Sequence, residues 1–111
     1  HFRVGAVLVT KDGKEYTGCN FENASFPATV CAERTAFAKA ISEGEREFAC
    51  IAIVGGREGE ISPFCAPCGV CRQVMSEFCG SDFEVVLGTP DKFKVFKFDE
   101  VLPMRFTGDE L

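Results

Sequence analysis

The 111-residue sequence contains no run of basic residues, and its formal net charge is −5. Proteins that bind duplex or single-stranded nucleic acid depend on clustered Lys and Arg side chains. The charge pattern therefore argues against a nucleic-acid polymer as partner and leaves a small neutral ligand as the favoured one.

Long apolar stretches are also missing. No segment approaches the roughly 20 residues that a membrane-spanning helix needs, and no secretory signal peptide is recognisable. Internal repeats and low-complexity segments are absent as well. We therefore expect no membrane partner and a cytoplasmic location.

Cysteine, by contrast, is abundant, with seven residues in this short chain. The number is odd, and the chain lacks the dense turns of a small disulfide scaffold. A Cys-x-x-Cys pair at Cys68 and Cys71 favours metal ligands or free thiols in a reducing compartment. Cys19, Cys50 and Cys79 have apolar neighbours in the sequence and are expected to be buried thiols.

The composition predicts a packed globular core. Hydrophobic residues make up 46% of the chain, and twelve of them are Phe, which excludes the low hydrophobicity of disordered proteins. The length suits one ordinary domain and leaves no room for a second core. We expect residues 1–111 to form a single domain.

Hydrophobic periodicity and turn residues predict five strands and two main helices. The strands are expected at residues 2–10, 15–20, 48–54, 83–87 and 94–98. The helices are expected at residues 31–43 and 68–79, and a short third helix is expected to be capped by Asp99. The order β-β-α-β-α-β-β predicts an α/β fold, a layered sheet with helices packed on it.

The most informative residues are Cys31-Ala32-Glu33 and Pro67-Cys68-Gly69-Val70-Cys71. Both segments fall at the N-terminal end of a predicted helix, where the helix dipole and free N–H groups favour the thiolate form that binds zinc. Three thiolates and one open position are typical of a catalytic zinc, whereas a structural zinc normally has four protein ligands. Zinc with an open position lowers the pKa of bound water towards about 7.

Two charged residues stand two and three positions after Cys31. Arg34 lies on the same helix face as Cys31, and its charge offsets the third thiolate, so we interpret it as a partner of the ligand sulfurs. Glu33 is not needed as a ligand, and its best role is general acid–base catalysis. Without the cysteines beside it, Glu33 would more simply be a solvated acid in a first helical turn.

The two segments belong to a longer pattern that resembles the small zinc-dependent cytidine deaminases. The matching segments are Phe2-Arg3-Val4-Gly5-Ala6, Gly18-Cys19-Asn20-Phe21-Glu22-Asn23-Ala24-Ser25, Cys31-Ala32-Glu33-Arg34-Thr35-Ala36 and Pro67-Cys68-Gly69-Val70-Cys71-Arg72-Gln73-Val74. The resemblance covers nearly the whole chain. It implies a three-layer α/β/α sandwich with a five-stranded mixed sheet. The N-terminal helix of that family is absent from this sequence.

The resemblance also implies roles in substrate binding. Asn20 and Glu22 match residues that hold the ribose hydroxyls, and Phe2 matches the aromatic residue beside the pyrimidine. The backbone of Ala32 is expected to contact the ring carbonyl. The carbonyl of Ala66 is expected to receive the 4-amino group.

Neighbouring subunits complete each pocket in the tetrameric members of the family. Phe26 and Phe106 occupy the positions of such residues, so the resemblance implies that Phe26 binds substrate and that Phe106 contacts a neighbouring subunit. A homotetramer is the expected assembly.

The implied reaction is the hydrolytic deamination of cytidine and deoxycytidine to uridine and deoxyuridine plus ammonia, in pyrimidine salvage, with one zinc ion per chain. Hydroxide attacks C4 of the cytosine ring while Glu33 moves the water proton to N3 and then assists the leaving amino group. Another cytosine-containing substrate, such as blasticidin S, is the alternative within the enzymes. Arg34 speaks against it, because blasticidin deaminases lack arginine after Cys-Ala-Glu.

Cys65 departs from the family pattern and leaves the ligand set open. It forms a Cys-x-x-Cys-x-x-Cys run, so that Cys65 and Cys68 are an alternative ligand pair. With Cys31 and Cys71 they would also make a four-sulfur structural zinc in a non-enzymatic interaction module. We favour Cys31, Cys68 and Cys71, because Pro67 and Arg72-Gln73-Val74 match the family pattern in that register.

Overall fold

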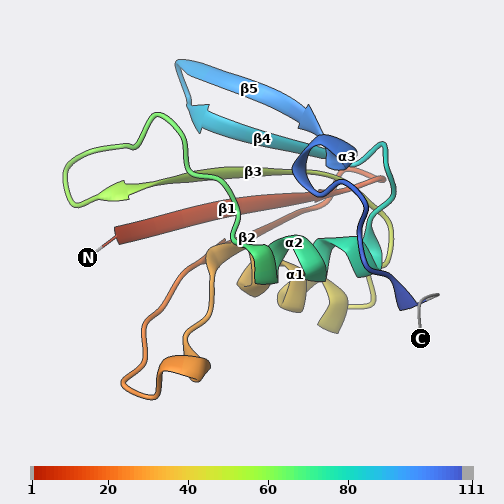
Figure 1. The fold of residues 1–111 in the computed structure, drawn as a ribbon, viewed down its shortest axis with the longest axis horizontal. Coiled ribbons are helices and arrows are strands. Elements are labelled where there is room, and N and C mark those ends of the chain that lie inside the picture. Colours follow the sequence, from red (N-terminus) through yellow and green to blue (C-terminus); the bar gives the residue numbers. More distant parts are fainter. Residues whose placement is uncertain (1, 109–111) are drawn as a thin grey trace.

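The computed structural model describes residues 2–108. Five strands form one mixed sheet in the order β2-β1-β3-β4-β5 (Figure 1). β1 pairs antiparallel with both β2 and β3, β3 pairs parallel with β4, and β4 pairs antiparallel with β5. The α/β class and the five-stranded mixed sheet are confirmed. The strands are β1 (Phe2–Thr10), β2 (Glu15–Cys19), β3 (Phe48–Arg57), β4 (Glu84–Thr89) and β5 (Lys92–Lys97).

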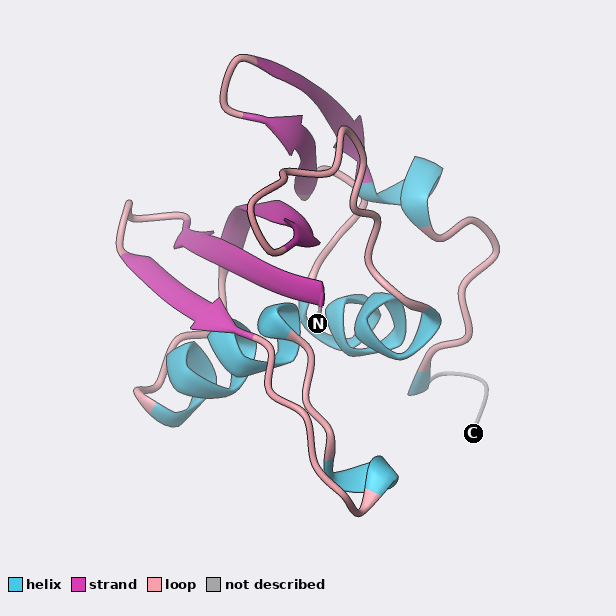
Figure 2. Ribbon diagram, turned by 90° about the vertical axis from the view of Figure 1, so that its left-hand side faces the viewer, coloured by secondary structure: helices cyan, strands magenta, loops and turns pink. Residues whose placement is uncertain are grey.

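The two long helices, α1 (Ala32–Ser42) and α2 (Gly69–Phe78), lie side by side beneath one face of the sheet (Figures 1 and 2). The short α3 (Phe98–Val101) follows β5. Within the described residues, 2–108, the two long helices form one of the two helical layers of the predicted sandwich. No helix in this part of the chain is long and apolar enough to cross a membrane.

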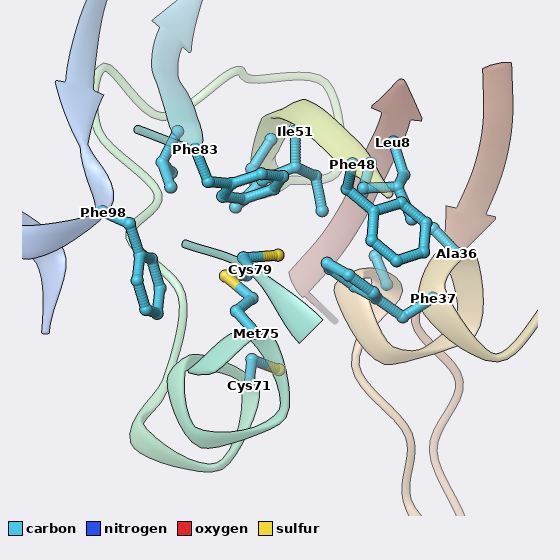
Figure 3. Packing of buried hydrophobic residues seen from close by; sticks show 14 of the residues in the cluster. Leu8, Ala36, Phe37, Phe48, Ile51, Cys71, Met75, Cys79, Phe83 and Phe98 are labelled. Atoms are coloured by element: carbon cyan, nitrogen blue, oxygen red, sulfur yellow. The ribbon is translucent and has the colours of Figure 1, made fainter. Parts of the chain in front are cut away.

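The core lies between the sheet and the two helices, and phenylalanines run through it. Phe48, Phe37, Phe83 and Phe98 form a chain of ring contacts with centroid separations of 5.1, 6.3 and 6.2 Å. Figure 3 shows Met75 of α2 packing among them. Burial of each such ring contributes about 1.5–3 kcal/mol, so these four phenylalanines are a main source of the stability of the core.

Some predicted boundaries were wrong by a few residues. α3 begins at Phe98, so Asp99 lies inside the helix and does not cap it; Glu100 Oε1 instead accepts a hydrogen bond from the Lys97 N–H at 2.9 Å. β3 continues to Arg57 because it pairs with β1 along its whole length. Glycine is rare in strands, and the Gly55-Gly56 pair conceals this extension in the sequence.

Gly18 of β2 sets how closely the sheet approaches α1. A Cβ atom at Gly18 would lie 2.5 Å from the carbonyl oxygen of Ala32 and 2.6 Å from the nitrogen of Ala36. The helix face that contacts the sheet is itself lined with alanines that are fully buried. The close approach therefore places the first turn of α1 directly against the backbone of β2.

We predict that Gly18→Ala lowers the free energy of unfolding by about 1–3 kcal/mol, because the added methyl group overpacks this contact. Gly5→Ala is the matched control on β1, since nothing lies within 4 Å of a Cβ atom there. The control is expected to keep or slightly raise stability. Urea unfolding of both variants measures the difference; equal midpoints would contradict the close contact at Gly18.

Candidate active site

Three cysteine thiols meet where the N-terminal ends of α1 and α2 come together. Cys31 is the N-cap residue of α1, Cys68 is the N-cap residue of α2, and Cys71 lies in the first turn of α2. The three Sγ atoms all lie within 4.8 Å of one another. The Sγ atoms of Cys31 and Cys68 are 3.8 Å apart, and those of Cys68 and Cys71 are 3.6 Å apart. No other such ligand group occurs in residues 2–108.

These separations fit a zinc ion. Tetrahedral zinc with Zn–S bonds of about 2.3 Å holds its sulfur ligands about 3.8 Å apart. A donor set made only of sulfur also excludes Ca²⁺ and Mg²⁺, which prefer oxygen. Three thiolates leave the fourth position free, as in catalytic zinc sites.

Cys68 and Cys71 differ in how readily they ionise. Burial opposes ionisation of Cys68, but hydrogen bonds from the Cys71 and Val70 backbone together with those of the neighbouring thiols hold the pKa of its thiol below the ordinary value. Cys71 is only 1% exposed, and burial together with the charge of Glu33 raises the pKa of its thiol. The N-terminal end of α2 thus favours the thiolate of Cys68, whereas burial disfavours the thiolate of Cys71.

Glu33 is buried in the first turn of α1, with 5% of its surface exposed. Burial raises the pKa of its carboxyl group, and a hydrogen bond with Cys71 and the charge of Arg34 oppose this shift. A carboxyl group that is buried and has a raised pKa is suited to exchanging protons near neutral pH. The charge of Glu33 in turn raises the pKa of the Cys71 thiol, so the two groups lie close enough to interact.

Arg34 lies beside the three thiols. Its Nη2 is 3.6 Å from the Sγ of Cys31 and donates a hydrogen bond to the carbonyl of Thr29 at 3.4 Å. The hydrogen bond with Cys31 raises the pKa of the guanidinium, whose charge offsets that of a thiolate. Its buried Nε has no hydrogen-bond partner within residues 2–108, so the guanidinium retains an unused donor beside the sulfurs.

Cys65 does not join the three thiols. It is half-buried and packs against Gly55 of β3, where an added Cβ atom would lie 2.7 Å from its Sγ. Burial and the charge of Glu33 raise the pKa of its thiol. This geometry does not favour Cys65 as a ligand, either in a pair with Cys68 or as the fourth sulfur of a structural site.

An open cavity of about 620 Å³ lies beside the first residues of β1. It brings together the expected substrate-binding residues Phe2, Asn20 and Glu22, whereas the three thiols and Glu33 are not part of its lining. Cys19, expected to be buried, is exposed and lines the cavity, because it faces outward at the end of edge strand β2. Residues that the sequence did not indicate also line it: Arg3, Val4 and Phe21.

Asn20 is held by the backbone of β1. Its Oδ1 accepts a hydrogen bond from the Val4 N–H at 2.9 Å, and its Nδ2 donates one to the carbonyl of Phe2 at 3.0 Å. An amide side chain has two donor hydrogens and two acceptor lone pairs. One of each therefore remains available toward the cavity.

The remaining expected site residues are spread over the structure. Ala32 is fully buried in the first turn of α1, and Ala66 is exposed just before Pro67. Phe26 is 80% exposed in the 3₁₀ helix η1 (Phe26–Ala28), on a loop that projects from the body of the molecule (Figure 2). Phe106 is 56% exposed near the end of the described chain. The described chain therefore does not bring Phe26 to the cavity.

Residues 1–89 match the family model of the cytidine and deoxycytidylate deaminase zinc-binding region. A cytidine deaminase of Sporosarcina psychrophila is 45% identical over 114 residues, which cover 99% of this chain and 79% of the relative. A probable cytidine deaminase of Dictyostelium discoideum is 45% identical over 113 residues, which cover 100% of this chain and 73% of the relative. Both similarities extend over nearly the whole chain.

The fold is likewise similar to solved structures. The crystal structure of a cytidine deaminase from Burkholderia pseudomallei superposes with a TM-score of 0.84 at 48% identity, covering 96% of this chain and 83% of that one. The cytidine deaminase from Mycobacterium tuberculosis superposes with a TM-score of 0.76 at 35% identity, covering 96% and 80%.

We predict that Asn20→Ala lowers the free energy of unfolding by about 1 kcal/mol, since the N–H of Val4 and the carbonyl of Phe2 lose a partner. Asn23→Ala is the control, because Asn23 Oδ1 binds only the nearby Ser25 N–H. Urea unfolding compares the two variants. If both are as stable as the parent chain, the Asn20 side chain does not hold β1.

Proposed function

Because the chain belongs to the cytidine and deoxycytidylate deaminase family, we propose that it catalyses the zinc-dependent hydrolytic deamination of cytidine and deoxycytidine in pyrimidine salvage. The products are uridine or deoxyuridine and ammonia. The observation that carries this proposal is the group of three thiols at the two helix N-termini, with the buried Glu33 in the first turn of α1. The family predicted from the sequence is confirmed.

One zinc ion per chain is held by Cys31, Cys68 and Cys71. The sulfur separations and the purely thiol donor set support this assignment. When bound, zinc lowers the pKa of water and so supplies hydroxide at neutral pH. Arg34 balances part of the negative charge of three thiolates, and its position 3.6 Å from the Cys31 sulfur supports that role.

Glu33 moves the protons of the reaction. Its carboxylate accepts a proton from the attacking water and delivers it to N3 of the cytosine ring as the oxygen bonds to C4. It then transfers the second proton of that water to the 4-amino group, which leaves as ammonia. The atoms of one water molecule are thus divided between the new carbonyl oxygen and the two protons that Glu33 transfers.

The open cavity holds the nucleoside. Phe2 packs beside the pyrimidine, and Glu22 and the free donor and acceptor of Asn20 bind the ribose hydroxyls. The backbone of Ala32 contacts the ring carbonyl, and the carbonyl of Ala66 accepts a hydrogen bond from the 4-amino group. The shared cavity of Phe2, Asn20 and Glu22 supports the first part of this assignment.

Residues 1–111 form one catalytic domain that assembles into a homotetramer in the cytoplasm. Phe26 completes a substrate pocket and Phe106 contacts a neighbouring subunit in that assembly. The exposure of both rings on the isolated chain supports these roles, since large exposed aromatic residues are typical of interfaces. All seven cysteines are free, which is consistent with a reducing compartment.

We predict that Glu33→Ala retains one zinc per chain but lowers kcat at least 100-fold, because no other group transfers the protons. The loss of cytidine absorbance in the ultraviolet measures turnover, and zinc is measured on the same samples. Glu77→Ala, an exposed acid on α2, is the control and keeps both properties. A Glu33→Ala variant with near-normal kcat would refute the assignment.

The ligand assignment predicts opposite results for two cysteines. Cys71→Ser is expected to lose most of its zinc, because one of three thiolates is gone. Cys65→Ser is expected to keep one zinc per chain, because Cys65 packs on Gly55 outside the thiol group. Zinc per chain is measured after dialysis; zinc loss in Cys65→Ser would instead favour a site with Cys65 as a ligand.

A further inference from the structure

Arg72 makes three hydrogen bonds around the start of α2, where two of the three thiols lie. Its backbone N–H donates to the carbonyl of Cys68 at 3.0 Å. Its Nε donates to the carbonyl of Pro67 at 2.8 Å, and its Nη1 donates to the carbonyl of Val101 at 2.7 Å. The side chain is half-buried, so these bonds are partly shielded from water.

Two of these bonds hold the backbone on both sides of Cys68. The carbonyl of Pro67 belongs to the peptide group before the Cys68 Cα, and the carbonyl of Cys68 belongs to the peptide group after it. The bond to the Cys68 carbonyl is the ordinary helical one that the backbone N–H of any residue except proline makes at position 72, whereas the bond to the Pro67 carbonyl comes from the arginine side chain. Together the two bonds restrain both peptide planes, and Cys68 keeps its extended conformation with φ −72° and ψ 169°. Since the Cys68 side chain is exposed, packing of that side chain does not supply this restraint.

The third bond connects this turn to the C-terminal segment. Val101 is the last residue of α3, and the chain beyond it is bound once to α2 and once to Cys79, the C-cap residue of α2. Arg105 Nη1 donates to the carbonyl of Cys79 at 2.8 Å, and Gln73 Nε2 donates to the carbonyl of Phe106 at 2.8 Å. Arg72 thus links the turn that carries Cys68 to a segment that is itself anchored along α2.

We propose that Arg72 is a positioning residue for the metal: its guanidinium fixes the Cys68 thiolate in the geometry in which zinc is bound, because it holds the carbonyls of Pro67 and Val101 together. The inference rests on the proposed zinc ligands and not on the identity of the substrate. Arginine is suited to this role because its planar group presents several N–H donors in fixed directions, whereas a lysine ammonium binds as a point charge.

The test measures zinc affinity by competition with a chromogenic chelator, without any nucleoside. Arg72→Ala is expected to bind zinc about 10–100-fold more weakly, the usual loss when a residue that orients a metal ligand is removed. Arg46→Ala is the matched control, because Arg46 Nη1 also donates to two carbonyls, those of Ile41 and Glu45, but at the far end of α1. The control is expected to keep the parent affinity.

Cobalt substitution separates positioning from general loosening of the fold. Arg72→Ala loaded with Co²⁺ is expected to show altered thiolate-to-cobalt and d–d absorption bands. Arg105→Ala, which loosens the C-terminal segment but leaves Pro67 bound, is expected to keep the parent spectrum. If Arg72→Ala does not fold, Arg72→Lys is compared instead, and an intermediate zinc affinity is expected because a lysine reaches fewer carbonyls.

Unchanged zinc affinity and an unchanged cobalt spectrum in the Arg72 variants would overturn the inference. Equal losses in Arg72→Ala and Arg105→Ala would overturn it too, since they would assign the effect to the segment as a whole. The parent protein distinguishes the two proposals: zinc binding without cytidine turnover would contradict the proposed function and leave the role of Arg72 standing.

Discussion

The meeting of two helix N-termini is the constraint on which the site depends. α1 and α2 run beneath the same face of the sheet, and their first turns bring Cys31 together with Cys68 and Cys71. A helix N-terminus offers unpaired N–H groups and positive potential, so two of them side by side favour three sulfur atoms that would otherwise repel one another as thiolates. The sheet sets the position of α1 through the close contact at Gly18.

Charge balance explains why the other charged residues stand where they do. Three thiolates exceed the charge of one zinc ion by one, and Arg34 lies at the Cys31 sulfur to offset the difference. Glu33 adds a further carboxylate in a buried position, where its charged form is disfavoured. The same burial that destabilises this carboxylate suits it to proton transfer.

The backbone around the thiols is held from outside the two helices. The guanidinium of Arg72 binds one carbonyl just before Cys68 and one far beyond it along the chain, which connects a metal site near residue 70 with the segment after α3. Phe106 belongs to that segment and is exposed. The turn that carries Cys68 and the segment that carries Phe106 are therefore joined by hydrogen bonds.

The sequence alone determined the element order and the mixed α/β class, because alternation and helix periodicity are local properties of the chain. It predicted the three thiols with Glu33 only through the register of the family resemblance, because cysteine spacing by itself left Cys65 as an alternative ligand. Only the tertiary structure decided that Cys65 stays apart from the thiols, since a glycine on β3 gives it a separate place to pack. The same holds for the exposed Cys19, the continuation of β3 to Arg57 and the bonds of Arg72 to Val101. Each depends on which residues of distant segments come to lie next to each other, and no local pattern encodes that.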